Sequence, residues 1–264
     1  MLKGSFDNFK DAKAKQVLSA FAVDAGLVLA HIEIDEKSNE IPAMQTLLGE
    51  LGIAGRIVTA DAIHCQKKTF EAAAAAQAHL IVQLKDNHPN LCQNVEVACA
   101  AAKPLSNVET VDGKRRNRHE TRAVTVFDAK AVVAKTQWQP HVAAVIRVER
   151  SVDAFQPSTG LWKPSAETSY YLSSHKIDAQ TAALAIRSHR AIAHKSHYTR
   201  DVTLREDALR IRANPGVFAR LRSWPMTSRA AINRTRSPKT DEPPPSTASN
   251  PSSKWSSVKS VEQP

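Results

Sequence analysis

The chain has 264 residues, with 36 Lys and Arg against 26 Asp and Glu, which gives a formal net charge of +10. This length allows one large hydrophobic core or two small ones. The basic excess favours a polyanionic partner, nucleic acid first, although a solvated basic surface would have the same composition. No stretch approaches the ~18 unbroken apolar residues of a membrane span and no signal peptide is evident, so the sequence predicts a soluble, cytoplasmic protein without a membrane partner.

Three cysteines, Cys65, Cys92 and Cys99, show no Cys-x-x-Cys spacing. An odd and sparse set of this kind is typical of a reduced protein that has neither a disulfide framework nor a structural zinc. Cys92 and Cys99 are seven residues apart on one predicted helix, and we expect both side chains to face the hydrophobic core.

The first elements predict a hairpin followed by a helix. After a polar start over Met1–Lys15, residues 16–23 and 27–34 have the pattern of strands, and the Asp24-Ala25-Gly26 sequence between them is typical of a turn. A helix over residues 40–51, capped by Asn39 or Ser38, is predicted from its apolar face.

The stretch Arg56–Gln66 carries the main candidate site. Ile57 and Val58 are β-branched and predict a short buried strand, and Asp61 stands where that strand should end. A carboxylate at the end of such a strand is a common ligand of a divalent metal, while a helix cap is the simpler alternative. His64 and Cys65 do not form a convincing nucleophile pair, because nothing positions a base.

The pattern then continues as helix, strand and helix. Alanine-rich residues 67–78 predict a helix, residues 79–84 an apolar strand, and Asn87 with Pro89 the start of a helix that ends near Ala102. The resulting order is strand, strand, helix, strand, helix, strand, helix. This order matches most of a ribonuclease-H-like sheet, with one strand fewer before the first helix.

The second half of the chain changes character. We interpret residues 104–175 as a β-rich insertion with strands at 121–128, 141–150 and 168–172, and Asp178 as the cap of a helix over residues 179–195. Residues 225–264 are rich in proline and serine and are predicted to be disordered, because they cannot bury enough apolar surface.

Nine short motifs, taken together, resemble one family. They are collinear from Leu2 to about Trp224, and they are Leu2-Lys-Gly-Ser5, Val17-Leu-Ser-Ala-Phe-Ala22, Asp35-Glu-Lys-Ser-Asn-Glu-Ile41, Val58-Thr-Ala-Asp-Ala62 with Cys65-Gln66-Lys67, Leu84-Lys-Asp-Asn-His-Pro89, His119-Glu-Thr-Arg122, Tyr170-Tyr-Leu-Ser-Ser174, Ile186-Arg-Ser-His189 and Asp201-Val-Thr-Leu-Arg-Glu-Asp207. With these motifs the chain resembles the insertion-sequence transposases of the H-repeat-associated type, a branch of the DDE transposases.

The resemblance implies an α/β, ribonuclease-H-like catalytic core, here over residues 1–103 and 176–224 on either side of the insertion. In this family three carboxylates hold two divalent metals, and Mg²⁺, with Mn²⁺ as a substitute, suits such hard oxygen ligands. Asp61 matches the second aspartate of the family. Glu206 is the expected third acid, and Asp207 is its near rival as a metal ligand.

One departure from the family bears on activity. The first aspartate of the family lies in an Asp-Gly-Lys sequence just before the segment that matches Leu2–Ser5, and this chain starts after that point. We therefore expect a mixed sheet that lacks its first strand, a gap or poorly supported pairing between the hairpin and the strand of Asp61, weak metal binding and almost no cleavage. The tail beyond Trp224 also departs from the family.

The expected partner is double-stranded DNA, at the ends of an insertion sequence and at its target, within the bacterial cytosol or nucleoid. A homodimer is compatible with the family. The candidate DNA contacts are basic or polar side chains, namely Lys85, Asn87, Lys114, Arg115, Arg116, Arg118, Arg187, His189, Arg190, Lys195, His197, Arg205 and Arg210.

Simpler interpretations stand beside several of these residues. An exposed charged loop explains residues 114–118 equally well, and capping of the following helix explains Asn87. His189, His194 and His197 match no zinc motif and fit a basic surface or a solvated helix face. For the whole chain, the alternatives to a transposase are a DNA-binding remnant that does not cut and an unstable pseudogene product.

Overall fold

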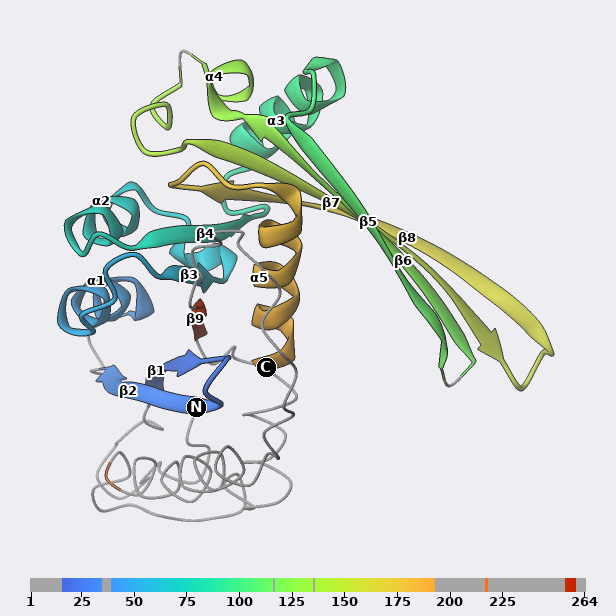
Figure 1. Ribbon diagram of the computed structural model, residues 1–264, viewed down its shortest axis with the longest axis horizontal. Coiled ribbons are helices and arrows are strands. Elements are labelled where there is room, and N and C mark those ends of the chain that lie inside the picture. The colour runs from blue at the N-terminus through green and yellow to red at the C-terminus, as the bar shows by residue number, and fades with distance from the viewer. Residues whose placement is uncertain are drawn as a thin grey trace, which may run out of the picture. The chain divides into compact units, whose positions relative to one another are not determined.

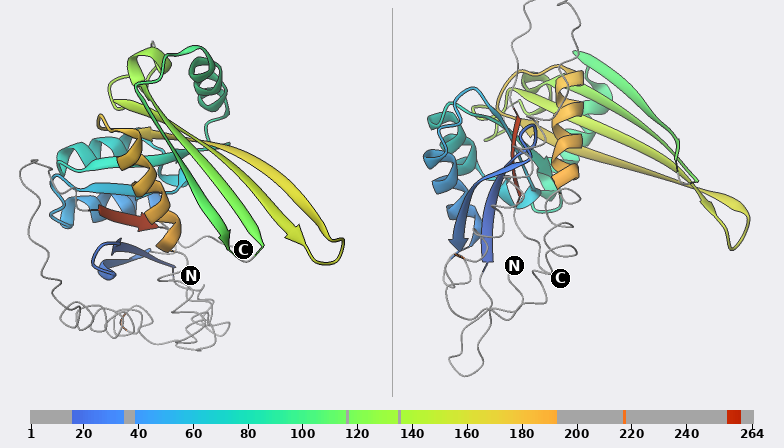
Figure 2. Two further views of the ribbon diagram at one scale, coloured as in Figure 1. Left: turned by 45° about the vertical axis from the view of Figure 1, so that its right-hand side comes forward. Right: turned by 60° about the horizontal axis from the view of Figure 1, so that its bottom comes forward.

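The computed structural model describes residues 16–34, 39–115, 117–134, 136–192, 217 and 255–259. The chain divides into two compact units. Unit 1 comprises Met1–Thr59, Ala75–Ala78 and Ser188–Pro264, and unit 2 comprises Ala60–Ala74 and His79–Arg187. Both units combine strands with helices, which confirms a mixed α/β fold (Figures 1 and 2).

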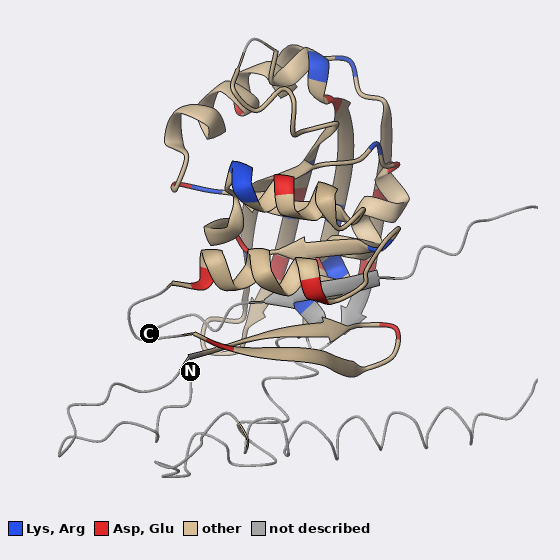
Figure 3. Cartoon of the chain, turned by 90° about the vertical axis from the view of Figure 1, so that its left-hand side faces the viewer, with Lys and Arg blue, Asp and Glu red and all other residues tan. Residues whose placement is uncertain are grey.

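Unit 1 begins with the predicted hairpin. Strands β1 (Gln16–Ala22) and β2 (Leu27–Ile34) pair antiparallel, with a register shift between Ala20 and Phe21. Gly26 has a φ of +64°, which a glycine adopts without strain, and its N–H donates to the carbonyl of Val23 at 3.3 Å. The hairpin carries charged carboxylates only at Asp24 and Glu33, so it is almost free of charge in Figure 3.

Helix α1 (Glu40–Glu50) follows the hairpin and packs on β1 and β2. The Asn39 side chain accepts a hydrogen bond from the N–H of Ile41 at 3.0 Å, so Asn39 is the cap that the sequence predicted. Met44, Leu47 and Leu48 are buried along the apolar face of the helix. These contacts fix the hairpin against α1.

Strand β3 (Ile57–Ala60) forms as predicted, but its neighbour in unit 1 was not predicted. Strand β9 (Trp255–Lys259) lies between β1 and β3, antiparallel to β1 and parallel to β3. Ser257 of β9 stands opposite both Phe21 and Thr59. The expected gap between the hairpin and the Asp61 strand is therefore wrong, and so is the expectation of disorder over residues 255–259.

Backbone hydrogen bonding explains why this position in the sheet is filled. Adjacent open edges on β1 and β3 would leave N–H and C=O groups without partners at the centre of a sheet, which costs free energy for each group. Trp255 and Val258 favour extended structure, so the five residues of β9 can form a strand there although they are distant from β1 and β3 in the sequence. Composition over a 40-residue window hides so short a strand.

Unit 2 contains most of the remaining elements. They are η2 (Ala62–His64), α2 (Lys67–Ala75), β4 (His79–Leu84), α3 (Pro89–Ala101), β5 (Ser106–Arg115), β6 (Arg118–Asp128), α4 (Ala129–Val132), β7 (Ala144–Gln156), β8 (Leu161–Ser173) and α5 (Ala179–Ile192), whose last turn belongs to unit 1. The bounds of β4 match the prediction, and α2 lies three residues short of the predicted end.

The strands of unit 2 run in the order β4-β8-β7-β6-β5, and each neighbouring pair is antiparallel. The four strands β5–β8 form the long twisted ribbon of Figures 1 and 2. Its inner half is packed with fully buried apolar side chains, among them Val126, Ile146 and Leu172. Leu80 and Val82 of β4 continue the same core.

The ribbon is longer than the sequence predicted. β5 was missed, because its polar and basic sequence resembles a loop, and β7 and β8 extend well beyond the predicted strands. Most of residues 114–118, considered as an exposed charged loop, belong to the turn and strand ends that join β5 to β6. The division of the chain into a catalytic core and an insertion stays a prediction.

Two helix starts distinguish between the predicted caps. Asp178 accepts from the N–H of Thr181 at 2.9 Å and caps α5, as expected. His88 is the residue that precedes α3, and Pro89 takes the first helical position, so the interpretation of Asn87 as a cap is wrong.

All three cysteines are free, with Cys65 and Cys99 buried and Cys92 only half-buried. Among the described helices none is long and apolar enough to cross a membrane.

Pairing of β9 with two neighbours makes Ser257 a test position. Ser257→Pro removes one backbone N–H from the centre of a strand, so it should lower the free energy of unfolding by about 1 kcal/mol or more. Thermal melting, with hydrogen exchange at Val58 and Phe21, measures the change. Ser257→Ala keeps the N–H and is the matched control. Equal melting of the two variants would show that β9 does not support the sheet.

Candidate functional site

Asp61 lies directly after β3, in extended backbone with φ −71° and ψ 167°, and is half-buried. The short helix η2 follows at once, yet the Asp61 side chain makes no capping hydrogen bond to it. The Asp61 side chain therefore does not cap this turn, and the capping alternative for the alanine-rich helix α2, which begins only at Lys67, stays a prediction. The position of Asp61 at the end of a buried strand is the one expected for a carboxylate that binds a ligand.

A second loop of unit 2 holds the Asp61 loop in place. This loop, Lys85–His88, follows β4, and its Asn87 Nδ2 donates to the carbonyl of Ala62 at 2.6 Å. His88 Nε2 donates to the carbonyl of Cys65, also at 2.6 Å. Two side chains of one loop thus satisfy two backbone acceptors of the other, which ties the Asp61 loop to the loop after β4 within unit 2.

An aromatic contact supports His88 from the other side. The His88 ring meets the Trp138 ring edge-on at 5.2 Å between centroids, and Phe70 of α2 meets the same indole at 6.0 Å. Lys67 Nζ donates to Gln137 Oε1 at 2.6 Å beside this contact. Trp138 and Phe70 are buried, so the support of the Asp61 loop reaches into the core of unit 2.

The neighbours of Asp61 are not nucleophiles. His64 and Cys65 are fully buried. Burial raises the pKa of the Cys65 thiol to about 12, which keeps the sulfur protonated near neutral pH. The Cys65 thiol is therefore a poor nucleophile near neutral pH.

Of the predicted metal ligands, Asp61 belongs to the described part of the chain, whereas Glu206 and Asp207 lie outside it. Within the described ranges no three His, Cys, Asp or Glu side chains group as a metal site. The half-buried carboxylate of Asp61 is a hard oxygen donor and fits one ligand position of a divalent cation. The pairing of Asp61 with Glu206 stays a prediction.

His189 was predicted as a DNA contact, and the structure places it in unit 1 against β3. Its Nδ1 forms a hydrogen bond of 3.0 Å with Thr59 Oγ1, and the contact is partly buried. Arg190 follows it in the last turn of α5 and is half-exposed. His189 therefore braces the strand that leads to Asp61.

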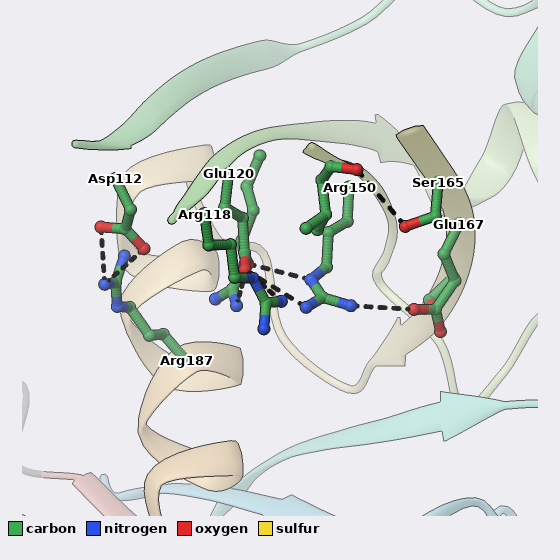
Figure 4. Close-up of polar contacts among 10 residues, drawn as sticks. Asp112, Arg118, Glu120, Arg150, Ser165, Glu167 and Arg187 are labelled. Carbon is green, nitrogen blue, oxygen red and sulfur yellow. Dashed lines mark hydrogen bonds and ion pairs between the residues drawn. The ribbon is translucent and has the colours of Figure 1, made fainter. Parts of the chain in front are cut away.

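Arg118 belongs to an ionic cluster on β6 and β7 (Figure 4). Glu120 lies at its centre and is only 8% exposed. Its carboxylate accepts from Arg118 at 2.7 Å and from Arg150 at 2.9 and 3.2 Å, and it also pairs with Arg122. Arg150 reaches Glu167 of β8 at 3.4 Å as well. We call these five residues the Glu120 cluster.

The other predicted DNA contacts are dispersed. Nη2 of Arg187, on α5, donates to both carboxylate oxygens of Asp112, on β5, at 2.8 Å, and about half of the Arg187 side chain is exposed. Lys85 is exposed on the loop beside Asp61. Lys114 and Arg115 lie at the end of β5, where Arg115 stands opposite Arg118. Outside the described residues lie Arg116, Lys195, His197, Arg205 and Arg210.

Reasoning from the sequence missed His88, Glu120, Arg122 and Arg150 as candidate site residues. For two of these a signal existed: Glu120 and Arg122 alternate with Arg118 along one strand, so the three must share one face. Arg150 is on that face only because β6 and β7 pair with Arg122 opposite Arg150. The role of His88 depends on a contact between two loops, and no local pattern indicates it.

Comparison with known proteins identifies the family. The chain matches the Transposase DDE domain over residues 8–229, which is most of its length. It belongs to this family. It is 32% identical over 218 residues to the H repeat-associated putative transposase YhhI of Escherichia coli K12, covering 80% of this chain and 56% of that relative. An uncharacterized protein in the dhlA 3′ region of Xanthobacter autotrophicus is 30% identical over 141 residues, or 52% of this chain and 47% of that protein.

The resemblance found in the motifs is thus confirmed. A Transposase DDE domain implies DNA transposition and a dependence on divalent metal in general terms. The chain spans about half the length of the curated relatives it matches first. What the whole protein binds and cuts is therefore a matter of proposal.

The Glu120 cluster makes a prediction about acid stability. Hydrogen bonds and charge from Arg150 and Arg122 outweigh burial and lower the pKa of Glu120 from 4.5 to about 2. Because the folded pKa lies below the unfolded one, the stabilisation is fully present above about pH 4.5 and is lost as the pH falls toward 2. It should amount to roughly 2–3 kcal/mol, allowing for solvent screening.

The variant Glu120→Gln should lose this stabilisation at neutral pH and show a flatter dependence of the unfolding free energy on pH between 5 and 2. Denaturant unfolding across that range measures it. Glu109→Gln, an exposed position on β5, is the control and should follow the wild type. A wild-type slope in the Glu120→Gln variant would refute the assigned role of Glu120.

Proposed function

We propose that the chain is the DDE domain of an insertion-sequence transposase, which binds double-stranded DNA and uses Mg²⁺, or Mn²⁺ in its place, at Asp61. The observation that carries this proposal is the half-buried Asp61 carboxylate at the end of β3, in a loop anchored by Asn87 and His88. Family membership supports it. A homodimer acting on paired DNA ends belongs to the same proposal.

In this proposal the residues of the chain divide the work. Asp61, together with Glu206 and with Asp207 as its rival, would hold the metal. Bound there, a divalent cation would neutralise charge that develops on phosphate oxygens during strand cleavage and transfer. Asn87 and His88 limit the motion of the Asp61 loop, since both hydrogen bonds end on its backbone. A fixed carboxylate binds a metal at a lower entropic cost than a mobile one.

Exposed cations beside this loop would meet the DNA backbone. Lys85 is exposed two residues before Asn87, so its ammonium can reach a phosphate near Asp61 without disturbing the loop. The basic residues of the β5–β6 turn and of α5 supply further contacts in the proposal. Backbone contacts of this kind position DNA without reading its sequence.

Strand β9 bears on the level of activity. In H-repeat-associated transposases, the strand between the hairpin and β3 is expected to carry the first metal-binding aspartate. Strand β9 takes that place here, and its sequence, Trp-Ser-Ser-Val-Lys, has no carboxylate. With β9 in this place we propose that the 264-residue chain binds DNA and cleaves it weakly or not at all. A DNA-binding protein that does not cut is the second candidate, and the same observation favours it.

Binding and cleavage can be measured side by side on the full chain. A labelled DNA duplex should bind with an affinity that falls steeply with salt, since phosphate contacts release counterions. In Mn²⁺, nicking should stay near the background. Failure to bind DNA at any salt concentration would refute the proposed function, and strong cleavage would refute the role given to β9.

The metal site has a test that does not need cleavage. Asp61→Asn removes the charge of the ligand with little change of shape, so it should weaken Mn²⁺ binding at least about tenfold. Calorimetric titration of Mn²⁺ into the full chain measures this. Asp86→Asn is the matched control, because Asp86 is an exposed carboxylate on the neighbouring loop. Equal Mn²⁺ affinity of the wild type and Asp61→Asn would exclude Asp61 as a ligand.

A further inference from the structure

The outer half of the β5–β8 ribbon has a charged face. Side chains on one face of β6 change from the buried Val126 and Val124 to Arg122, Glu120 and Arg118 as the strand is followed outward. On β7 the same face changes from Val148 to Arg150, which stands opposite Arg122. Alternation in a strand keeps these positions on one side, so the charges form a row beyond the apolar core.

The Glu120 cluster has more cation than its carboxylates can neutralise. Three guanidiniums, from Arg118, Arg122 and Arg150, meet the carboxylates of Glu120 and Glu167, which leaves an excess of one positive charge. Three guanidiniums offer about 15 N–H donors, and two carboxylates offer about eight acceptor sites. The cluster therefore has donor capacity for a further anion.

The arrangement is also held in place. Both oxygens of Glu120 accept hydrogen bonds from Arg150, which fixes the plane of that guanidinium, and Arg150 contacts Glu167 through its remaining Nη1. The side chains of Arg122 and Arg150 are 19% and 23% exposed, while that of Arg118 is 46% exposed. The guanidiniums are thus ordered by buried contacts and still reach solvent.

We propose that the Glu120 cluster is a binding site for the phosphate groups of the DNA backbone. Arg118, Arg122 and Arg150 make the contacts, and Glu120 is a positioning residue that holds the three guanidiniums on one face. Planar guanidiniums with fixed orientation match the geometry of phosphate oxygens, which favours this ligand over a diffuse counterion. This inference rests on the proposed function, since it requires that the chain binds DNA.

The arrangement differs from a structural ion pair in its stoichiometry. Asp112 and Arg187 illustrate the structural case in the same unit, where one guanidinium nitrogen donates to both oxygens of one carboxylate. The Glu120 cluster instead gathers three like charges, whose mutual repulsion a bound phosphate would relieve. An anion is therefore the ligand that the cluster is suited to bind.

Salt-dependent DNA binding tests the site. Fluorescence anisotropy of a labelled duplex, titrated with the full chain at several salt concentrations, gives the slope of log K against log salt. Arg150→Gln and Arg118→Gln should each weaken binding several-fold on any DNA sequence and make the slope shallower by about 0.9 for each phosphate that the variant no longer neutralises. Arg118→Gln is included because its exposed side chain makes a loss of folding less of a concern.

The control is Arg147→Gln. Arg147 is on β7 like Arg150, but it lies three residues away, so alternation along the strand places its side chain on the opposite face. Arg147 lies over the Phe127 ring at 5.4 Å and pairs with Glu149 at 3.3 Å. Its variant should bind DNA as the wild type does. All variants are first compared by thermal melting, and binding is read only from those that melt cooperatively.

Glu120→Gln separates a positioning role from simple charge. Removal of a negative charge should tighten DNA binding if only net charge matters, whereas loss of positioning should weaken binding and make the salt slope shallower. Weaker binding supports the proposal, and tighter binding overturns the role of Glu120. If the wild type binds DNA but Arg150→Gln and Arg118→Gln keep its affinity and slope, the site is refuted while the proposed function stands. If the wild type binds no DNA, the proposed function fails first.

Discussion

Pairing of backbone groups is the constraint on which unit 1 depends. Strands β1 and β3, both in the first 60 residues, each have an edge with open backbone groups. Strand β9 pairs with both, antiparallel to β1 and parallel to β3. The chain spans nearly 200 residues between Thr59 and Ser257, its partner across the sheet, so this pairing costs loop-closure entropy. That cost grows only slowly with the length of the loop, whereas unpaired backbone at the centre of a sheet is costly for every residue. Filling the position is therefore favourable even from so far along the chain.

Local physics explains how much of the fold was predictable. The hairpin, the Asn39 cap, β4 and the Asp178 cap were all predicted from sequence, because each depends on residues close together in the chain, the most distant being the hairpin partners Gln16 and Ile34. β9 could not be predicted in this way. Its five residues lie in a segment of proline and serine, and only the edges of β1 and β3 favour an extended conformation there.

The site shows the same division between local and long-range information. The position of Asp61 at the end of β3 followed from two β-branched residues and was confirmed, whereas the anchoring of its loop by Asn87 and His88 was not foreseen. Side-chain bonds to a carbonyl more than 20 residues away leave no periodic pattern in the sequence. For Asn87, a rule about helix starts offered an alternative that is wrong, because the residue is close enough to Pro89 to resemble a cap.

The β5–β8 ribbon explains why a polar sequence was mistaken for a loop. In a half-buried strand, alternation of apolar and polar residues reveals the strand, but the outer part of this ribbon has no continuous apolar face among its described residues. Its cohesion there comes from the ladder of backbone bonds and from charge pairs across the strands, of which Arg122 and Arg150 with Glu120 are the most buried. The Glu120 carboxylate stabilises the folded ribbon through these pairs, whereas the half-exposed guanidinium of Arg118 adds little stability by itself. One carboxylate would be enough to pair with one guanidinium, so folding alone does not explain the excess of guanidinium over carboxylate, and from this excess we infer an anionic partner for the outer face.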